Sequence, residues 1–194
     1  MIITGKYPYL RLRRSRKFHW SRRLVQENNL SVNDFILPIF LIEGKNKKIP
    51  IKSMPNVYRY SIDMLATIVD KAIRRKIPMV ALFPYTNPKL KNNLGTEALN
   101  ENNLVCQGIR YIKKRYKNTI GIMCDVALDP YTSHGHDGIL NNNYIINDET
   151  VDLLVEQSIL QAKMGCDVIA PSDMMDGRIK KIRQKLDKEN LKDV

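Results

Sequence analysis

The stretch IGIMCDVALDPYTSHGHDG, residues 120–138, joins an apolar run to a loop that is dense in acids and histidines. A short apolar run that passes into Pro, Gly and polar residues predicts a buried strand that ends in a loop. Carboxylates and imidazoles at this density suit proton transfer or metal binding. The stretch therefore predicts a strand whose C-terminal end carries reactive side chains.

The same succession of strand, polar loop and helix recurs along the chain on both sides of this stretch. The expected strands are residues 35–42, 79–84, about 120–128 and 166–170. Apolar stripes at helical spacing run from Ile62 to Ile73, from Leu104 to Ile112 and from Val151 to Ala162, and a charged helix is expected at about 179–189. The basic stretch 46–60 is expected to be a loop.

Alternation of strands and helices predicts an α/β fold with parallel strands and right-handed crossovers. Open α/β sheets and (β/α)8 barrels both carry their functional residues after the C-terminal ends of the strands. No strand is followed by a glycine-rich nucleotide-binding motif, which argues against a nucleotide-binding sheet. Four strand–helix units amount to half of an eight-unit barrel.

The composition indicates a globular protein, since 43% of the 194 residues are hydrophobic and 27% are charged. No apolar run reaches about 18 residues, so neither a membrane span nor a membrane partner is expected. Cys106, Cys124 and Cys166 are far apart and form no C-x-x-C pair, which argues against a disulfide framework or a cysteine zinc site. We expect reduced, buried thiols in a cytoplasmic protein.

A basic segment opens the chain and contributes to the formal net charge of +12. It interleaves arginines with Phe18 and Trp20 and has no acid before Glu27. Such a segment is able to bind nucleic acid through phosphate contacts and stacking, and it equally suits an arm that packs on another subunit. The chain is therefore divided into an N-terminal arm, residues 1–30, and a main domain, residues 31–194.

Two long motifs resemble the signatures of one enzyme family. Residues 125–138, DVALDPYTSHGHDG, resemble the signature loop of the porphobilinogen synthases (5-aminolevulinate dehydratases), and residues 170–178, APSDMMDGR, resemble that family's second signature. The segments ALFP at 81–84 and MPNVYR at 54–59 and the arginines of 11–14 also match, in the family's order. One departure is Asn56, where the family usually has Gly.

This resemblance implies a TIM barrel, of which the chain carries about four βα units together with an extended N-terminal arm. It implies a lyase that condenses two molecules of 5-aminolevulinate into porphobilinogen, in the biosynthesis of haem and other tetrapyrroles. It also implies a homo-octamer in which the arms embrace neighbouring subunits. Residues 1–30 are accordingly expected to contact a subunit and not nucleic acid.

The resemblance also assigns roles to individual side chains. It places Asp125 beside the substrate, which Asp125 can orient or deprotonate, and it gives Asp137 and Ser172 polar contacts in the same pocket. Asp125, Asp137 and Ser172 are thus the predicted catalytic residues, and Asp125 and Ser172 also bind substrate. Neighbouring carboxylates raise one another's pKa, as a base that shares a proton requires. Asp173 or Asp176 is instead expected to cap the following helix.

The predicted metal chemistry rests on three positions of the signature loop. Zinc-dependent members of the family have three cysteines where this chain has Ala127, Asp129 and Asp137. Carboxylates are hard oxygen ligands and alanine offers none, so no zinc is expected. Asp129 and Asp137 are candidate ligands for Mg²⁺ or a monovalent cation, and the resemblance places an allosteric Mg²⁺ site outside this chain.

The family's mechanism needs two lysines that form imines with the substrate, and these follow the fifth and sixth strands of the barrel. Lys45 and Lys89 follow strands here, but they match no lysine motif of the family, so we expect them to be solvated. The prediction is that the 194-residue chain alone is inactive.

Two other classes of function stay open on the residues alone. His134 and His136 form an H-x-H pair, as in metal-dependent hydrolases of TIM-barrel type, but the remaining histidine, His19, lies in the arm. The basic arm suits a nucleic-acid-binding module. Neither alternative explains the two long signatures together.

Overall fold

The computed structural model describes residues 5–194 and divides the chain into two units, with the boundary between Asp34 and Phe35. The first unit contains a short helix, α1 (His19–Leu24), and carries Tyr9 and Trp20 with 89% and 66% of their surface exposed. Residues 1–4 of the predicted arm lie outside the described residues. The unit ends at Asp34, slightly beyond the predicted end of the arm at residue 30.

The second unit is built on a six-stranded sheet with the order β2-β3-β1-β4-β5-β8. The four predicted strands are present as β1 (Ile36–Ile42), β4 (Met79–Tyr85), β5 (Gly121–Val126) and β8 (Val168–Pro171), and they pair in parallel. The helices are α2 (Leu65–Arg74), α3 (Leu104–Tyr116), α4 (Asn147–Lys163) and α5 (Arg178–Lys188). The fold is therefore α/β, made of successive βα units of a TIM barrel, and the sheet does not close within residues 35–194.

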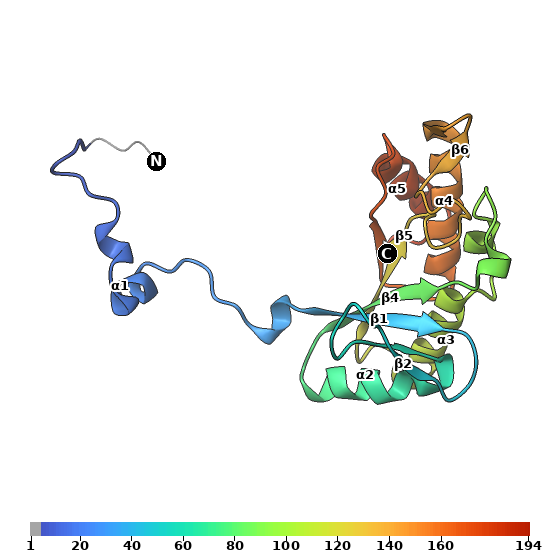
Figure 1. The fold of residues 1–194 in the computed structure, drawn as a ribbon, viewed down its shortest axis with the longest axis horizontal. Coiled ribbons are helices and arrows are strands. Elements are labelled where there is room, and N and C mark those ends of the chain that lie inside the picture. Colours follow the sequence, from blue (N-terminus) through green and yellow to red (C-terminus); the bar gives the residue numbers. More distant parts are fainter. Residues whose placement is uncertain (1–4) are drawn as a thin grey trace. The chain divides into compact units, whose positions relative to one another are not determined.

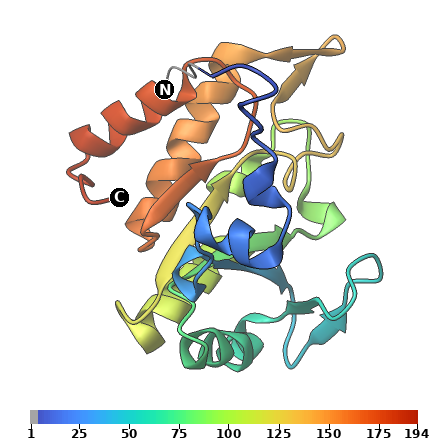
Figure 2. The same ribbon diagram turned by 90° about the vertical axis from the view of Figure 1, so that its left-hand side faces the viewer.

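The helices cover one face of this sheet. Figure 1 shows α2 and α3 on the same side of β1 and β4, and Figure 2 shows α4 and α5 next to each other along β8. Side chains alternate between the two faces of a strand, so every second residue of the strands enters the core under the helices. None of the described helices is long and apolar enough to cross a membrane.

The core consists of two clusters of buried apolar side chains. Ile39, Leu82 and Ile122 of the strands pack on α2 and α3, and Val126 of β5 packs on α4 and α5 with Leu154. The opposite face of the sheet is only half-buried and includes Phe40 and Phe83, whose rings lie 5.7 Å apart. The sheet thus has one packed face and one open face.

Two pairs of short strands were not expected from the sequence. β2 (Lys48–Pro50) and β3 (Tyr58–Tyr60) pair antiparallel within the predicted loop 46–60, and β3 joins the sheet beside β1. The prediction of a loop is wrong for these residues, because three-residue strands are too short to show an alternating pattern. β6 (Ile139–Asn141) and β7 (Tyr144–Ile146) form a separate hairpin after the signature motif.

Asparagines occupy the left-handed backbone positions of these turns. Asn56, between β2 and β3, has φ +66°, and Asn142 and Asn143, between β6 and β7, have φ +48° and +62°. Asn tolerates positive φ better than most residues other than Gly. Asn56, at a position where the resemblance leads us to expect Gly, therefore preserves the backbone geometry that glycine would supply.

Candidate active site

Asp125 and Ser172 come together at the C-terminal ends of two neighbouring strands. The register pairs Asp125 of β5 with Ala170 of β8, so Ser172, which follows β8, lies beside the end of β5. The Ser172 hydroxyl donates a hydrogen bond to Asp125 Oδ1 at 2.5 Å, across a sequence separation of 47 residues. The fold thus joins the two predicted substrate-binding residues in one hydrogen bond.

Further carboxylates surround Asp125 and change its chemistry. Burial raises the pKa of Asp125, the Ser172 hydrogen bond opposes this, and the charges of Asp173 and Asp137 raise the pKa further. Burial likewise raises the pKa of Asp129, and Asp125 and Asp137 add to the effect. A cluster of this kind favours a carboxyl group that keeps a proton closer to neutral pH than an isolated aspartate does.

Two buried glutamines of α4 hold the backbone of this site. Gln161 Nε2 donates to the carbonyl of Asp125 at 3.0 Å, and Gln157 Nε2 donates to the carbonyl of Ala127 at 3.4 Å. Both glutamines are at least 98% buried. The sequence analysis missed them, although two polar residues at i and i+4 on the apolar stripe of a helix are a detectable signal.

The signature loop, residues 125–138, is held by hydrogen bonds within the loop and to Asn93. Thr132 Oγ1 donates to the carbonyl of His136 at 2.8 Å, and His134 Nε2 lies 3.2 Å from the carbonyl of Asn93. The backbone N–H of His136 donates to His134 Nδ1 at 3.2 Å, so both ring nitrogens of His134 contact backbone groups and neither is left for a metal ion. His134 therefore stabilises the loop, and the alternative of an H-x-H metallohydrolase loses a ligand.

Asp173 closes the turn before α5. Its Oδ1 accepts a hydrogen bond from the N–H of Met175 at 2.7 Å, and its Oδ2 lies 3.1 Å from Arg178 Nε. Burial raises the pKa of Asp173, although the Met175 N–H and Arg178 lower it. The cap residue of α5 is Gly177 at φ +79°, and no side chain caps the helix. The predicted cap by Asp173 or Asp176 is therefore wrong.

The donor set of the loop suits an oxygen-bound ion better than zinc. No three His, Cys, Asp or Glu side chains within residues 5–194 are grouped so that they could hold a metal ion. Ala127 is 3% exposed and has no ligand atom, which leaves the carboxylates of Asp129 and Asp137. Two carboxylates fit Mg²⁺ that keeps several waters, and they do not fit a tetrahedral zinc–thiolate site.

Three lysines, Lys45, Lys89 and Lys91, follow strands β1 and β4. Lys45 and Lys89 are both exposed, as solvated loop lysines are. Lys91 instead approaches the signature loop, where its Nζ donates to the carbonyl of Asp129 at 3.4 Å. Its charge slightly lowers the pKa of Asp129 against the larger effect of burial.

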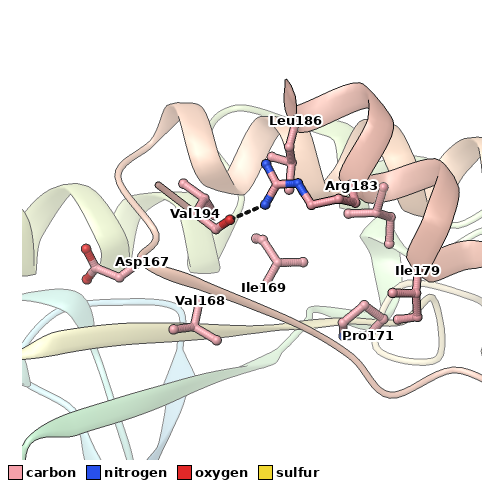
Figure 3. Close-up of a pocket in the computed structure, with 9 residues that line it drawn as sticks. Asp167, Val168, Ile169, Pro171, Ile179, Arg183, Leu186 and Val194 are labelled. Atoms are coloured by element: carbon pink, nitrogen blue, oxygen red, sulfur yellow. Dashed lines mark hydrogen bonds between the residues drawn. The ribbon is translucent and has the colours of Figure 1, made fainter. Parts of the chain in front are cut away.

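A largely apolar hollow of about 200 Å³ lies between β8 and α5 (Figure 3). Val168, Ile169 and Leu186 line it, and Arg183 crosses it to donate a hydrogen bond to the carbonyl of Val194 at 2.5 Å. None of the predicted catalytic residues lines this hollow. It is a packing feature of β8 and α5 and lies apart from the carboxylate cluster.

Fold and site together define an α/β protein of parallel βα units with a carboxylate–hydroxyl site at the strand ends. Comparison with protein families gives this class its name. The model of the delta-aminolevulinic acid dehydratase family matches residues 9–194, and the chain belongs to this family.

Individual relatives support the same assignment. The delta-aminolevulinic acid dehydratase of Bradyrhizobium diazoefficiens is 55% identical over 185 residues, which cover 95% of this chain and 52% of the relative. The protein of the same name from Ruminiclostridium josui is 42% identical over 184 residues, covering 95% of this chain and 88% of the relative.

A solved structure shows the same fold. The crystal structure of delta-aminolevulinic acid dehydratase (porphobilinogen synthase) from Toxoplasma gondii ME49, in complex with the reaction product porphobilinogen, matches with a TM-score of 0.86 at 39% identity. The match covers 95% of this chain and 52% of that one. The chain thus spans about half the length of this structure and of the Bradyrhizobium relative.

Proposed function

We propose that this chain supplies one half of the active site of a porphobilinogen synthase, a lyase that condenses two molecules of 5-aminolevulinate into porphobilinogen. The observation that carries the proposal is the hydrogen bond from Ser172 to Asp125 at the strand ends of a chain of this family. The Toxoplasma gondii structure, which contains porphobilinogen, supports the choice of substrate. The product's biosynthetic role is then that of a tetrapyrrole precursor.

Asp125 is the proposed proton carrier and substrate-orienting group. Its raised pKa keeps the protonated form populated nearer to neutral pH, where a group exchanges protons with a substrate most effectively. Ser172 fixes the carboxyl group through its hydrogen bond and offers its own oxygen to the substrate. Asp137 acts through its charge, which raises the pKa of Asp125 and of Asp129.

Asp129 and Asp137 are the proposed ligands of a hydrated Mg²⁺ or a monovalent cation. Both carry hard oxygen atoms, and Asp129 interacts with the charge of Asp137. A cation bound there would offset the mutual repulsion of the carboxylates and orient polar groups of the substrate. An allosteric Mg²⁺ site elsewhere in the whole protein remains part of the proposal.

The N-terminal arm is proposed to contact a neighbouring subunit in a homo-octamer, and not nucleic acid. The exposed aromatic side chains of Tyr9 and Trp20 support this, because aromatic residues are enriched at protein interfaces. We also propose a cytoplasmic location, which suits the three buried free thiols, Cys106, Cys124 and Cys166.

A chimera tests the function. This chain would replace the matching 185 residues of the Bradyrhizobium diazoefficiens relative, and porphobilinogen formed from 5-aminolevulinate would be measured in a colour assay. We expect an active chimera whose rate falls about 100-fold or more with Asp125→Asn. Asp152→Asn is the control, because that side chain is 72% exposed on α4, and it should leave the rate unchanged. A folded but inactive chimera would refute the proposed function.

The chain alone provides the complementary measurement. Borohydride traps an imine between a lysine and 5-aminolevulinate as a stable adduct. We expect no adduct and no porphobilinogen with the 194-residue chain, because the lysines that follow its strands, Lys45 and Lys89, are exposed and match no lysine motif of the family. An adduct on either lysine would show that this chain carries its own nucleophile.

A further inference from the structure

A second cavity, partly open and lined by both polar and apolar side chains, lies in the same unit, apart from the Asp125–Ser172 pair. It has a volume of about 130 Å³ and is enclosed by Glu43 after β1, by the segment after β4, by Tyr131 of the signature loop and by the first turn of α3. None of the predicted catalytic residues lines it. No role in the proposed reaction accounts for it.

Carboxylates give this cavity its charge. Glu43 Oε2 accepts a hydrogen bond from Asn87 Nδ2 at 3.1 Å, and Glu97 Oε2 accepts one from Asn100 Nδ2 at 3.0 Å. Both bonds use Oε2, which leaves Oε1 of each glutamate for a ligand. No Lys or Arg is among the residues that line the cavity within the described chain. The formal charge of the lining is therefore −2.

The buried hydroxyl of Thr86 is an independent indication that this cavity binds a polar ligand. Thr86 is 7% exposed, and its hydroxyl has no hydrogen-bond partner among the residues that the structure describes. Tyr131 is 2% exposed, and burial raises its pKa well above the ordinary value, so it remains a neutral hydroxyl. Buried polar groups in folded proteins nearly always have a partner, and an unpaired one points to an ion or water that binds there.

The chemistry of the lining favours a cation over an anion. The N-terminus of α3, where Asn103 caps the N–H of Cys106 at 2.8 Å, carries about half a positive charge and would favour an anion by itself. The two glutamates outweigh this half charge. With a volume of about 130 Å³, the cavity has room for one cation with part of its hydration shell.

We propose that this cavity binds one hard divalent cation, Mg²⁺ or Ca²⁺, through Glu43, Glu97 and the hydroxyls of Thr86 and Tyr131. Oxygen ligands with retained water are the coordination that these ions prefer. The ion ties the segments after β1 and β4 to the signature loop through Tyr131. It is separate from the ion proposed at Asp129 and Asp137, and it does not depend on the proposed activity.

Terbium luminescence tests this site in the purified chain. Tb³⁺ binds to oxygen sites of this kind and emits when a nearby tyrosine transfers excitation to it, so Tyr131 is a built-in reporter. We expect saturable emission that Ca²⁺ and Mg²⁺ compete away. Tyr131→Phe should remove the emission, and it should also weaken the stabilisation of the chain by Ca²⁺ in thermal unfolding, because it removes one oxygen ligand.

Variants separate this cavity from the other carboxylates. The double variant Glu43→Gln and Glu97→Gln should weaken terbium binding by about tenfold or more. The exposed controls Glu101→Gln and Asp152→Asn should leave it unchanged. Circular dichroism checks that each variant is folded. If the double variant is unfolded, the nearly isosteric Thr86→Val takes its place and should also weaken binding. Three results would overturn the proposal. They are no emission, emission that survives these cavity variants in folded protein, and emission that Asp129→Asn abolishes.

Discussion

Gly138 is the position of the signature loop where one added methyl group should destabilise the fold most directly. A Cβ atom built there would lie 2.6 Å from Ile145 Cγ2, 3.0 Å from Met175 Cε and 3.1 Å from Thr150 Oγ1. Contact at 2.6 Å is far inside the ordinary carbon–carbon separation of about 3.5–4.0 Å. Gly138→Ala therefore forces its neighbours apart.

The neighbours differ in how far they can yield. Met175 ends in a flexible side chain, but Thr150 is fully buried and its hydroxyl accepts a hydrogen bond from the N–H of Ile139 at 2.9 Å. Overpacking destabilises the fold by about 1–3 kcal/mol. Replacing glycine by alanine also lowers the entropy of the unfolded chain, which stabilises the fold by about 0.4–1 kcal/mol. We expect a net loss of about 1–2 kcal/mol, which lowers the Tm by about 2–8 °C in a protein of this size.

Urea and thermal unfolding followed by far-UV circular dichroism measure this loss. Gly121→Ala is the matched control, because its Cβ would come closest to the flexible end of Met79, at 3.0 Å, and would otherwise meet Met79 Cγ at 3.5 Å and Pro78 O at 3.6 Å, which are ordinary contacts. The control should change the free energy of unfolding by less than about 0.5 kcal/mol. Equal effects of the two substitutions, or a Gly138→Ala variant as stable as the parent, would refute the packing argument.

Three further predictions concern the support of the site. The raised pKa of Asp125 contributes stability that is fully present below the ordinary value of about 4 and is lost as the pH rises through the folded value. Asp125→Asn should therefore gain stability relative to the parent as the pH rises above about 4, and a difference between their urea midpoints that does not change with pH would contradict this. Asp167→Asn should lower the free energy of unfolding by about 1–2 kcal/mol, because Asp167 accepts hydrogen bonds from Lys113 Nζ at 2.6 Å and from the N–H of Ile122 at 2.8 Å. An unchanged urea midpoint would count against this. Gln161→Leu removes the donor to the Asp125 carbonyl, and in the chimera it should lower kcat while far-UV circular dichroism stays the same.

The sequence predicted the main strands and helices because their apolar patterns are long. β1 and β4 are continuous apolar runs, and α3 and α4 carry stripes of several turns. Their alternation fixes a parallel sheet, whose strand ends must lie side by side. The meeting of Asp125 and Ser172 follows from this alternation, although 47 residues separate them.

Short elements and buried polar contacts escaped prediction for a different reason. The β6–β7 hairpin turns on Asn142 and Asn143, a pair that suits a turn with two left-handed residues, and this signal was available but overlooked. The roles of Gln157 and Gln161 depend on the carbonyls that they meet, Ala127 and Asp125, which only the packing of α4 on β5 determines. A local pattern contains no information about such partners.

The electrostatics of the site follow from burial more than from the number of acids. Asp125, Asp129 and Asp173 each have a raised pKa whose largest cause is burial, and the charges of neighbouring acids raise it by less. Any element that packs on the open face of the sheet excludes more water from Asp125 and so raises its pKa further. The Ser172 hydrogen bond opposes this rise, because it stabilises the ionised carboxylate. Assembly of a full active site on this face should therefore raise the pKa of Asp125 further and favour its protonated, proton-donating form. The hydrogen bond from Ser172 limits this rise.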